Sequence, residues 1–234
     1  MDEFREFYQR HLPHWQPKGA VFFVTTRLKD SLPHEIIEML RQERAQQKLA
    51  IQCLPESERA KQDYLDERRY FGKWDAYLDK AKFGPTWLSQ PEIAEILKEA
   101  LHFRDGKVYD LHAYSILSNH THIVFEPIGG RSEWHSDPES DYQSDLLVSD
   151  YQSDLQIKPL QKIMQSLKRH TARKSNSILG REGAFWQDES YDHVIRDNWE
   201  YLRIIHYVLQ NPVNASLASK REDWLWTYCK PDLL

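Results

Sequence analysis

Short runs rich in β-branched and aromatic residues alternate along this chain with longer segments whose apolar residues recur at helical spacing. Residues 20–27 (AVFFVTTR) form the first such run and predict a strand. Two more strands are expected over 107–117 and 120–127. The short Ser118–Asn119 connection between these two suits a β-hairpin.

Helical spacing dominates the segments between and after these strands. Residues 34–82 are charged and Gln-rich, and they read as a largely peripheral helical insertion that Pro55 interrupts. Pro91 then opens a helix expected over 91–104, because proline is favoured at the first helical position.

Two further helices are predicted near the C-terminus. Residues 159–178 place Leu160, Ile163, Met164 and Leu167 on one inward face. The last helix is expected from about Asn198 to Gln210, with Asn211–Pro212 ending it. Strands and helices in this order indicate a single α+β domain over residues 1–234 with a small, mostly antiparallel sheet.

The net charge of −5 is an average over two unlike blocks. Residues 132–157 carry seven acids and no Lys or Arg, and residues 158–181 carry seven bases and no acid. The acidic block contains a near-duplication of nine residues over 140–157, which predicts a flexible insertion at about 130–157. Local charge decides which partner a surface attracts, so a polyanion-binding face remains open.

Several classes of protein are excluded by composition. No run of about 18 apolar residues occurs, so no membrane-spanning segment is expected. The N-terminal residues hold no apolar stretch behind basic ones, so no signal peptide is expected. Two cysteines are too few for a disulfide framework or a four-cysteine zinc site. These features favour a cytoplasmic location.

A pair of histidines is the first candidate for chemistry. His120 and His122 are two apart in a predicted strand, so both imidazoles project from one face and can reach one metal ion. The same spacing also occurs in pairs of solvated or hydrogen-bonded histidines. Four other histidines keep rival ligand sets open: His112, His170, His193 and His206.

The last predicted helix carries the second candidate. Its apolar arc includes Trp199 and Leu202, whereas Tyr207 lies near the middle of the polar face with Asn211 one turn away. Tyr207 is either a surface tyrosine or a phenol nucleophile that needs a cation, a base or a metal for activation. Asn211 could supply an oxygen as a third metal ligand.

The order of these features resembles one family. The matching stretches are 83–127, which includes Asn-His-x-His, the basic helix LQKIMQSLKRHTARKSN, and 185–217, which includes Tyr-x-x-x-Asn-Pro-Val. With the first strand they cover about two thirds of the chain, and 34–82 and 128–157 lie outside them. The sequence resembles the REP-associated tyrosine transposases, a branch of the single-tyrosine HUH transposase superfamily.

The resemblance implies a fold, a site and a reaction. The fold would be ferredoxin-like, an antiparallel sheet with flanking helices. His120 and His122, with Asn211 as third ligand, would hold Mg²⁺ or Mn²⁺, and Tyr207 would be the nucleophile. Tyr207 would cleave and rejoin single-stranded DNA at REP-type hairpins through a 5′-phosphotyrosine link. The protein would act as a monomer, with a homodimer left open, in the bacterial cytoplasm on the nucleoid.

The basic helix gains a role under this resemblance. Lys168, Arg169, Arg173 and Lys174 fit phosphate contacts along DNA, and Arg196 is a further candidate. The alternative is that this charged helix face is only solvated.

Two other functions stay open on the sequence alone. One is a regulator that binds hairpin DNA without cutting it. The other is a metal-dependent phosphoesterase that uses water in place of Tyr207.

Overall fold

A computed structural model describes residues 19–128 and 159–233. The acidic insertion and its tandem repeat lie outside these described residues, so their predicted flexibility stays a prediction. Among the helices within the described ranges, none combines the length and apolar character needed to cross a membrane.

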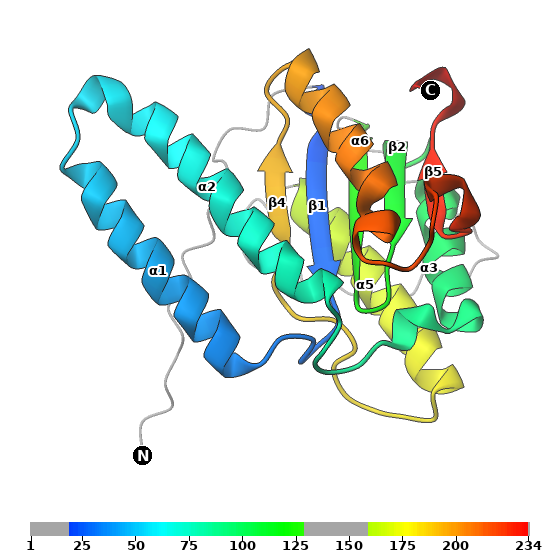
Figure 1. The fold of residues 1–234 in the computed structure, drawn as a ribbon. Coiled ribbons are helices and arrows are strands. Elements are labelled where there is room, and N and C mark those ends of the chain that lie inside the picture. The colour runs from blue at the N-terminus through cyan, green and yellow to red at the C-terminus, as the bar shows by residue number, and fades with distance from the viewer. Residues whose placement is uncertain (1–18, 129–158, 234) are drawn as a thin grey trace, which may run out of the picture.

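The sheet has five strands in the order β4-β1-β3-β2-β5, and each neighbouring pair is antiparallel. The strands are β1 (Phe22–Arg27), β2 (Tyr109–Ile116), β3 (His120–Pro127), β4 (Tyr191–Val194) and β5 (Thr227–Cys229). Strand β3 lies at the centre, between β1 and β2 (Figure 1).

Four strands and two helices follow a ferredoxin-like path. The chain runs β1, α3, β2, β3, α5, β4, and these strands lie in the order β4-β1-β3-β2. Strand β5 is added beside β2 at one edge. The expected α+β class with an antiparallel sheet and flanking helices is therefore confirmed.

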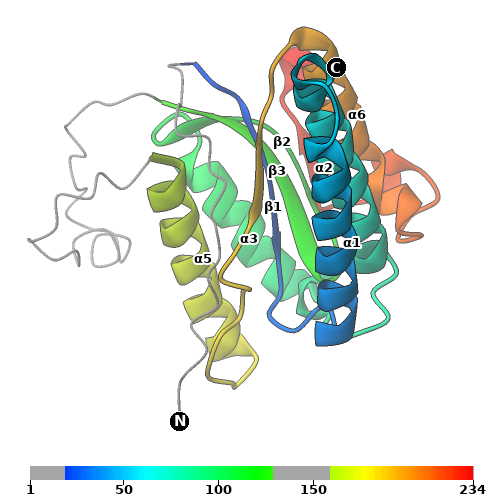
Figure 2. The ribbon, with the colours of Figure 1, turned by 90° about the vertical axis from the view of Figure 1, so that its left-hand side faces the viewer.

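Helices cover both faces of the sheet (Figure 2). One face carries α3 (Pro91–Arg104) and α5 (Pro159–Ile178), and the other carries α6 (Asn198–Asn214) and a hairpin of α1 (His34–Gln52) and α2 (Glu56–Asp79). Three short 3₁₀ turns complete the described chain: η1 (Trp87–Ser89), η2 (Arg221–Asp223) and η3 (Pro231–Leu233).

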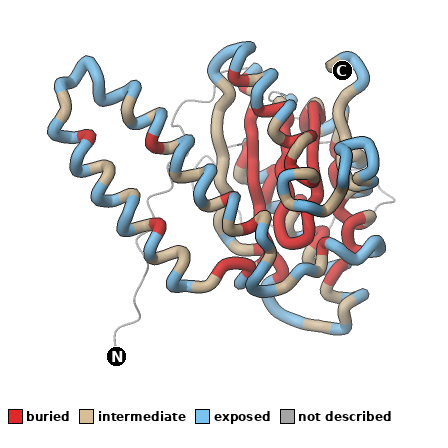
Figure 3. Tube along the Cα trace, in the orientation of Figure 1, coloured by how far each residue is buried: buried red, intermediate tan, exposed pale blue. Residues whose placement is uncertain are grey.

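Alternation along β3 divides the core in two. Ile123 and Phe125 point into the larger cluster with α3 and α5, whereas Val124 packs with α6. His120 and His122 share the face of Val124, as the period of two predicts. Six consecutive residues of β3 are buried, and the buried strands stand out in Figure 3.

The predicted end of the last helix is wrong. Helix α6 continues through Pro212 and ends at Asn214. A proline removes one backbone donor, and here only the hydrogen bond to Val208 is lost before the helix ends. Asn211 therefore stays helical, one turn beyond Tyr207.

The predicted apolar arc of this helix is also corrected. Trp199 is 85% exposed and Leu202 is 50% exposed. The arc that packs against the sheet is formed by Ile204, Ile205, Val208 and Leu209. Trp199 and Leu202 lie instead on the solvent-facing side of α6, with the exposed residues Arg203 and His206.

Candidate metal and tyrosine site

The two histidines of β3 lie side by side beneath α2 and α6, and both are 0% exposed. The Nδ1 atom of His120 lies 2.7 Å from Oδ1 of Asn119, and that of His122 lies 2.7 Å from Oγ1 of Thr25. Asn119 also donates from Nδ2 to the carbonyl of Leu78, which fixes its Oδ1 toward His120. His120 therefore donates from Nδ1 and presents the lone pair of Nε2 to the site.

A carboxylate from α2 faces both imidazoles. Nε2 of His120 lies 3.6 Å from Oδ1 of Asp75, and Nε2 of His122 lies 3.4 Å from Oδ2 of the same group. Asp79, one turn further along α2, has its Oδ1 atom 3.6 Å from Nε2 of His120. Asp75 is buried, which is rare for an aspartate unless it is paired or binds a metal.

Helix α6 adds the remaining two groups. The hydroxyl of Tyr207 donates to Oδ2 of Asp75, and Nδ2 of Asn211 lies 3.3 Å from the same oxygen. The ring of Tyr207 packs edge-on against Phe23 and Phe71, so it is held in place by apolar contacts. Tyr207 is half-buried, neither a core residue nor a solvated surface tyrosine.

Five buried polar atoms at this point have no hydrogen-bond partner. They are Nε2 of His120, Nε2 of His122, Oδ1 of Asp75, Oδ1 of Asp79 and Oδ1 of Asn211. Buried polar atoms are nearly always satisfied, so such a cluster needs an explanation. The donor atoms of Asp75, His120 and His122 lie within 4.8 Å of one another. Two imidazole nitrogens and carboxylate or amide oxygens suit a divalent cation such as Mn²⁺ or Mg²⁺.

Electrostatics place His120 and Asp75 in the protonation states that a metal requires. Burial lowers the pKa of His120 to about 3, so this imidazole is neutral at pH 7. Burial alone would raise the pKa of Asp75, but the imidazoles, His122 above all, and Asn211 bring it below its ordinary value. Burial and the charge of Asp75 raise the pKa of Asp79 to about 7. Neutral imidazoles and an ionised carboxylate are the forms that ligate metals.

The structure brings His120, His122, Tyr207 and Asn211 together, as their expected roles require. Sequence reasoning missed Asp75 and Asp79, because it gave residues 34–82 no part in the site. A signal was present: Asp75 is four residues after Phe71 and three before Leu78, so a carboxylate interrupts an apolar helical face.

The rival histidines lie elsewhere within the described part of the chain. His112 accepts or donates at Nδ1 with the hydroxyl of Tyr201, and His193 pairs with Glu200. His170 is buried in α5 and His206 is exposed on α6.

The basic residues of α5 lie on the opposite side of the sheet from this cluster. Nζ of Lys168 donates to the backbone carbonyls of Gln187 and Asp188 at 2.9 and 3.1 Å, and burial lowers its pKa to about 8. Arg169, Arg173 and Lys174 are exposed on the outer face of α5. The structure thus separates the predicted phosphate-contacting residues from the metal and tyrosine site by the thickness of the sheet.

Arg196 lies on the other side, just before α6. Its guanidinium is 4.5 Å from the ring centre of Tyr64 on α2, and its backbone N–H donates to Glu200. It is exposed, and it contributes to the contacts between α2 and α6 and does not lie with the basic residues of α5.

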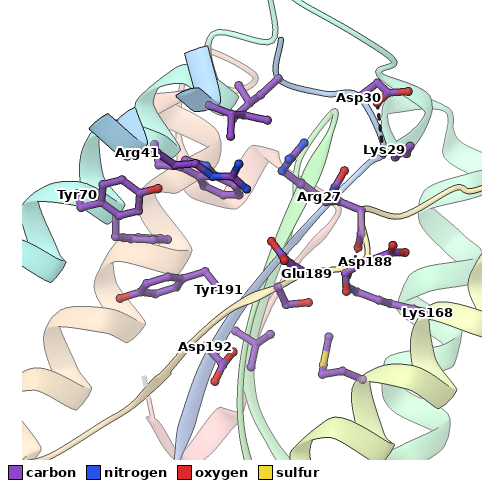
Figure 4. A pocket seen from close by; sticks show the side chains of 18 of the residues that line it. Arg27, Lys29, Asp30, Arg41, Tyr70, Lys168, Asp188, Glu189, Tyr191 and Asp192 are labelled. Atoms are coloured by element: carbon purple, nitrogen blue, oxygen red, sulfur yellow. Dashed lines mark hydrogen bonds and ion pairs between the residues drawn. The ribbon is translucent and has the colours of Figure 1, made fainter. Parts of the chain in front are cut away.

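A groove of about 510 Å³ lies beside the site, between the α1–α2 hairpin and α5 (Figure 4). Its floor is the edge of the sheet at β4, where Tyr191 stacks on Phe71 with ring centres 4.3 Å apart. The hairpin wall carries Arg41 and Tyr70, and Arg27 lies above the floor. Both signs of charge line the groove, because Asp188, Glu189 and Asp192 face these bases.

Comparison with solved structures finds a similarity to a REP-associated tyrosine transposase that was solved bound to a REP hairpin. The two chains are 15% identical, the match covers 97% of this chain and 82% of that one, and the TM-score is 0.40. No protein-family model matches the sequence, and comparison with curated proteins finds no relative. A likeness this distant says nothing about the residues of the site, so the functional argument rests on the site itself.

Proposed function

We propose that this protein is a metal-dependent DNA transesterase that cleaves and rejoins single-stranded DNA through Tyr207. One observation carries the proposal: the hydroxyl of Tyr207 and the Nε2 atoms of His120 and His122 converge on one carboxylate. A nucleophile and a cation site at one point are what attack on a phosphodiester requires.

The cation would be held by His120 and His122, with oxygens from Asp75 and Asn211 as further ligands. When bound, it would polarise the scissile phosphate and offset the negative charge that develops on its oxygens. Thr25 and Asn119 hold the imidazoles so that Nε2 faces the site, and the surrounding apolar side chains exclude water.

The proposed step exchanges one phosphate ester for another. Oη of Tyr207 attacks the phosphorus, the bond from phosphorus to the 3′-oxygen breaks, and the phenol proton leaves with that oxygen as a 3′-OH. The products are a 5′-phosphotyrosyl link and a free 3′-OH. The ester is conserved, so the step reverses or transfers the joint without an energy source.

The substrate we propose is a REP-type hairpin with single-stranded flanks, bound by a monomer. The exposed bases of α5, Arg169, Arg173 and Lys174, would contact the DNA backbone. Because α5 and the site lie on opposite sheet faces, one DNA that contacts both would have to pass an edge of the sheet, and the groove of Figure 4 lies at the β4 edge.

The test is a labelled single-stranded REP hairpin with its flanks, incubated with Mn²⁺ or Mg²⁺ and resolved on a denaturing gel. We expect a metal-dependent protein–DNA adduct that is absent in Tyr207→Phe and retained in Tyr201→Phe, a matched change on the same helix. Cleavage without an adduct would overturn the proposal in favour of a water-using phosphoesterase. Binding without cleavage or adduct would overturn it in favour of a regulator.

A further inference from the structure

The candidate site is closed. His120, His122 and Asn211 are 0% exposed and Asp75 is 1% exposed, so no DNA strand reaches them in this arrangement. The cover is helix α2, which passes over the site and inserts Asp75 into it. We call the α1–α2 hairpin, His34–Asp79, the helical arm.

The carboxylate of Asp75 stands where a scissile phosphate would have to stand. Tyr207 donates to Oδ2 of Asp75 and the amide of Asn211 contacts the same oxygen. Nε2 of His122 also faces Oδ2, whereas Nε2 of His120 faces Oδ1. The reaction needs the same hydroxyl on the phosphorus atom and the same cation beside its oxygens. A carboxylate and a phosphate are both hard anionic oxygen donors, so the two groups compete for one place.

The helical arm is built to detach. Two of the 19 residues of α1 are buried, and three of the 24 residues of α2 are buried. Two of those three residues in α2 are aspartates. The groove of Figure 4 separates much of its inner face from β4 and α5. Figure 3 shows the arm mostly exposed along its length. An element with few buried apolar contacts opens at a low free-energy cost.

Polar contacts hold the first half of α2 against α6. The hydroxyl of Tyr64 donates to Oε1 of Glu200, and Nη2 of Arg203 donates to the same oxygen at 3.1 Å and to the Tyr64 hydroxyl at 3.3 Å. The chain enters the arm after Asp30 and leaves it before Gly84. These two residues are in direct backbone contact, so the two ends of the arm lie side by side. Such an arrangement suits a hinge at these ends and a latch on α2.

We propose that the helical arm is a lid: it opens to admit DNA, and Asp75 gives up its place beside His120 and His122 to a phosphate oxygen. This inference rests on the proposed function and names how that site is regulated. In the closed state Asp75 retains the cation and restrains Tyr207. In the open state the substrate supplies the oxygen that Asp75 supplied.

The test ties the lid shut. Tyr64→Cys and Arg203→Cys, in a background with Cys53→Ser and Cys229→Ser, are joined by a short reducible bis-methanethiosulfonate. The matched control joins Glu43→Cys to Lys73→Cys, an ion pair between α1 and α2, which links the two helices of the arm without tying them to α6. Both proteins are loaded with Mn²⁺ and given the hairpin DNA.

We expect the 64–203 bridge to slow adduct formation more than tenfold and reduction to restore it, with the 43–73 bridge within about twofold of unbridged protein. With Tyr207→Phe added, DNA should give ³¹P coupling to Mn²⁺ in electron–nuclear double resonance with the 43–73 bridge and not with the 64–203 bridge. Equal adduct formation, or equal coupling, in the two bridged proteins would overturn the lid.

A separate readout keeps the lid testable if the proposed reaction fails. Should no protein form an adduct, the rate at which EDTA strips Mn²⁺ is compared between the two bridged proteins. A rate at least fivefold lower with the 64–203 bridge supports a lid over the cation. Equal rates overturn it, whatever the reaction is.

Discussion

His120 and His122 each use Nδ1 for a fixed partner and turn Nε2 toward Asp75. The period of a strand predicted that both imidazoles lie on one face of β3. The period of a helix predicted that Asn211 lies near Tyr207. Asp75 did not follow from either, because the docking of α2 over the sheet is a tertiary contact that no local pattern encodes.

Thr25 offers a test of how the imidazoles are held. Thr25→Val removes the hydrogen bond to Nδ1 of His122. Because such partners orient a metal-bound histidine, we expect the dissociation constant for Mn²⁺ to rise about tenfold or more. Isothermal titration calorimetry measures it. The control is Thr26→Val, since Oγ1 of this buried neighbour has no hydrogen-bond partner; equal constants for the two variants would contradict the account.

At the scale of elements, sequence patterns located α3 and α5 at their observed bounds, because each has a proline at its start and one apolar face. They failed at the end of α6, where Pro212 is tolerated in the last turn. Strand β4 was not predicted either, since its four residues, Tyr191–Val194, are all half-buried and lack a strong apolar alternation.

The contact between α2 and α6 is testable through pH. Burial alone would raise the pKa of Glu200, but hydrogen bonds from Tyr64 and from the amide of Arg196 bring it below its ordinary 4.5. An acid with a lowered pKa stabilises the fold above its unfolded pKa and loses that effect as pH falls through the folded one. Glu200→Gln should therefore cost about 1–3 kcal/mol at pH 7 and little well below pH 4.5.

Thermal unfolding from pH 7 downward measures this difference. Glu99→Gln, an exposed change on α3, is the control and should follow wild type at every pH. A constant gap between Glu200→Gln and wild type across the range would refute the role of the ionised carboxylate.

The junction of the helical arm with the core gives a second prediction at this scale. Gly84 has φ of +68°, and a Cβ there would lie 2.1 Å from the carbonyl oxygen of Asp30. Gly106 has φ of +71° with nothing within 4 Å of such a Cβ. We expect Gly106→Ala to cost about 1–2 kcal/mol, the left-handed strain alone, and Gly84→Ala to cost more. Urea unfolding measures both free-energy costs. Equal costs would show that the backbone at the junction shifts to accommodate the added Cβ, and would contradict a tightly packed junction.

At the scale of the molecule, the exposed bases of α5 and the candidate site lie on opposite faces of one sheet. The sequence showed both features but not their separation, which depends on the face of the sheet against which each helix packs. Changing Arg169 and Arg173 to Ala should weaken hairpin-DNA binding and lower the slope of log K against log salt by about 1 per residue. Fluorescence anisotropy at several salt concentrations measures the slope. An unchanged slope would mean that α5 is only solvated.

The central claim is that Tyr207 becomes covalently joined to DNA. The most direct measurement is mass spectrometry of the protein after incubation with hairpin DNA and Mn²⁺, followed by nuclease trimming and peptide mapping. The account predicts a phosphonucleotide on the peptide that carries Tyr207, and none when EDTA replaces the metal. A modified peptide that carries a different tyrosine, or cleaved DNA with every peptide unmodified, would contradict it.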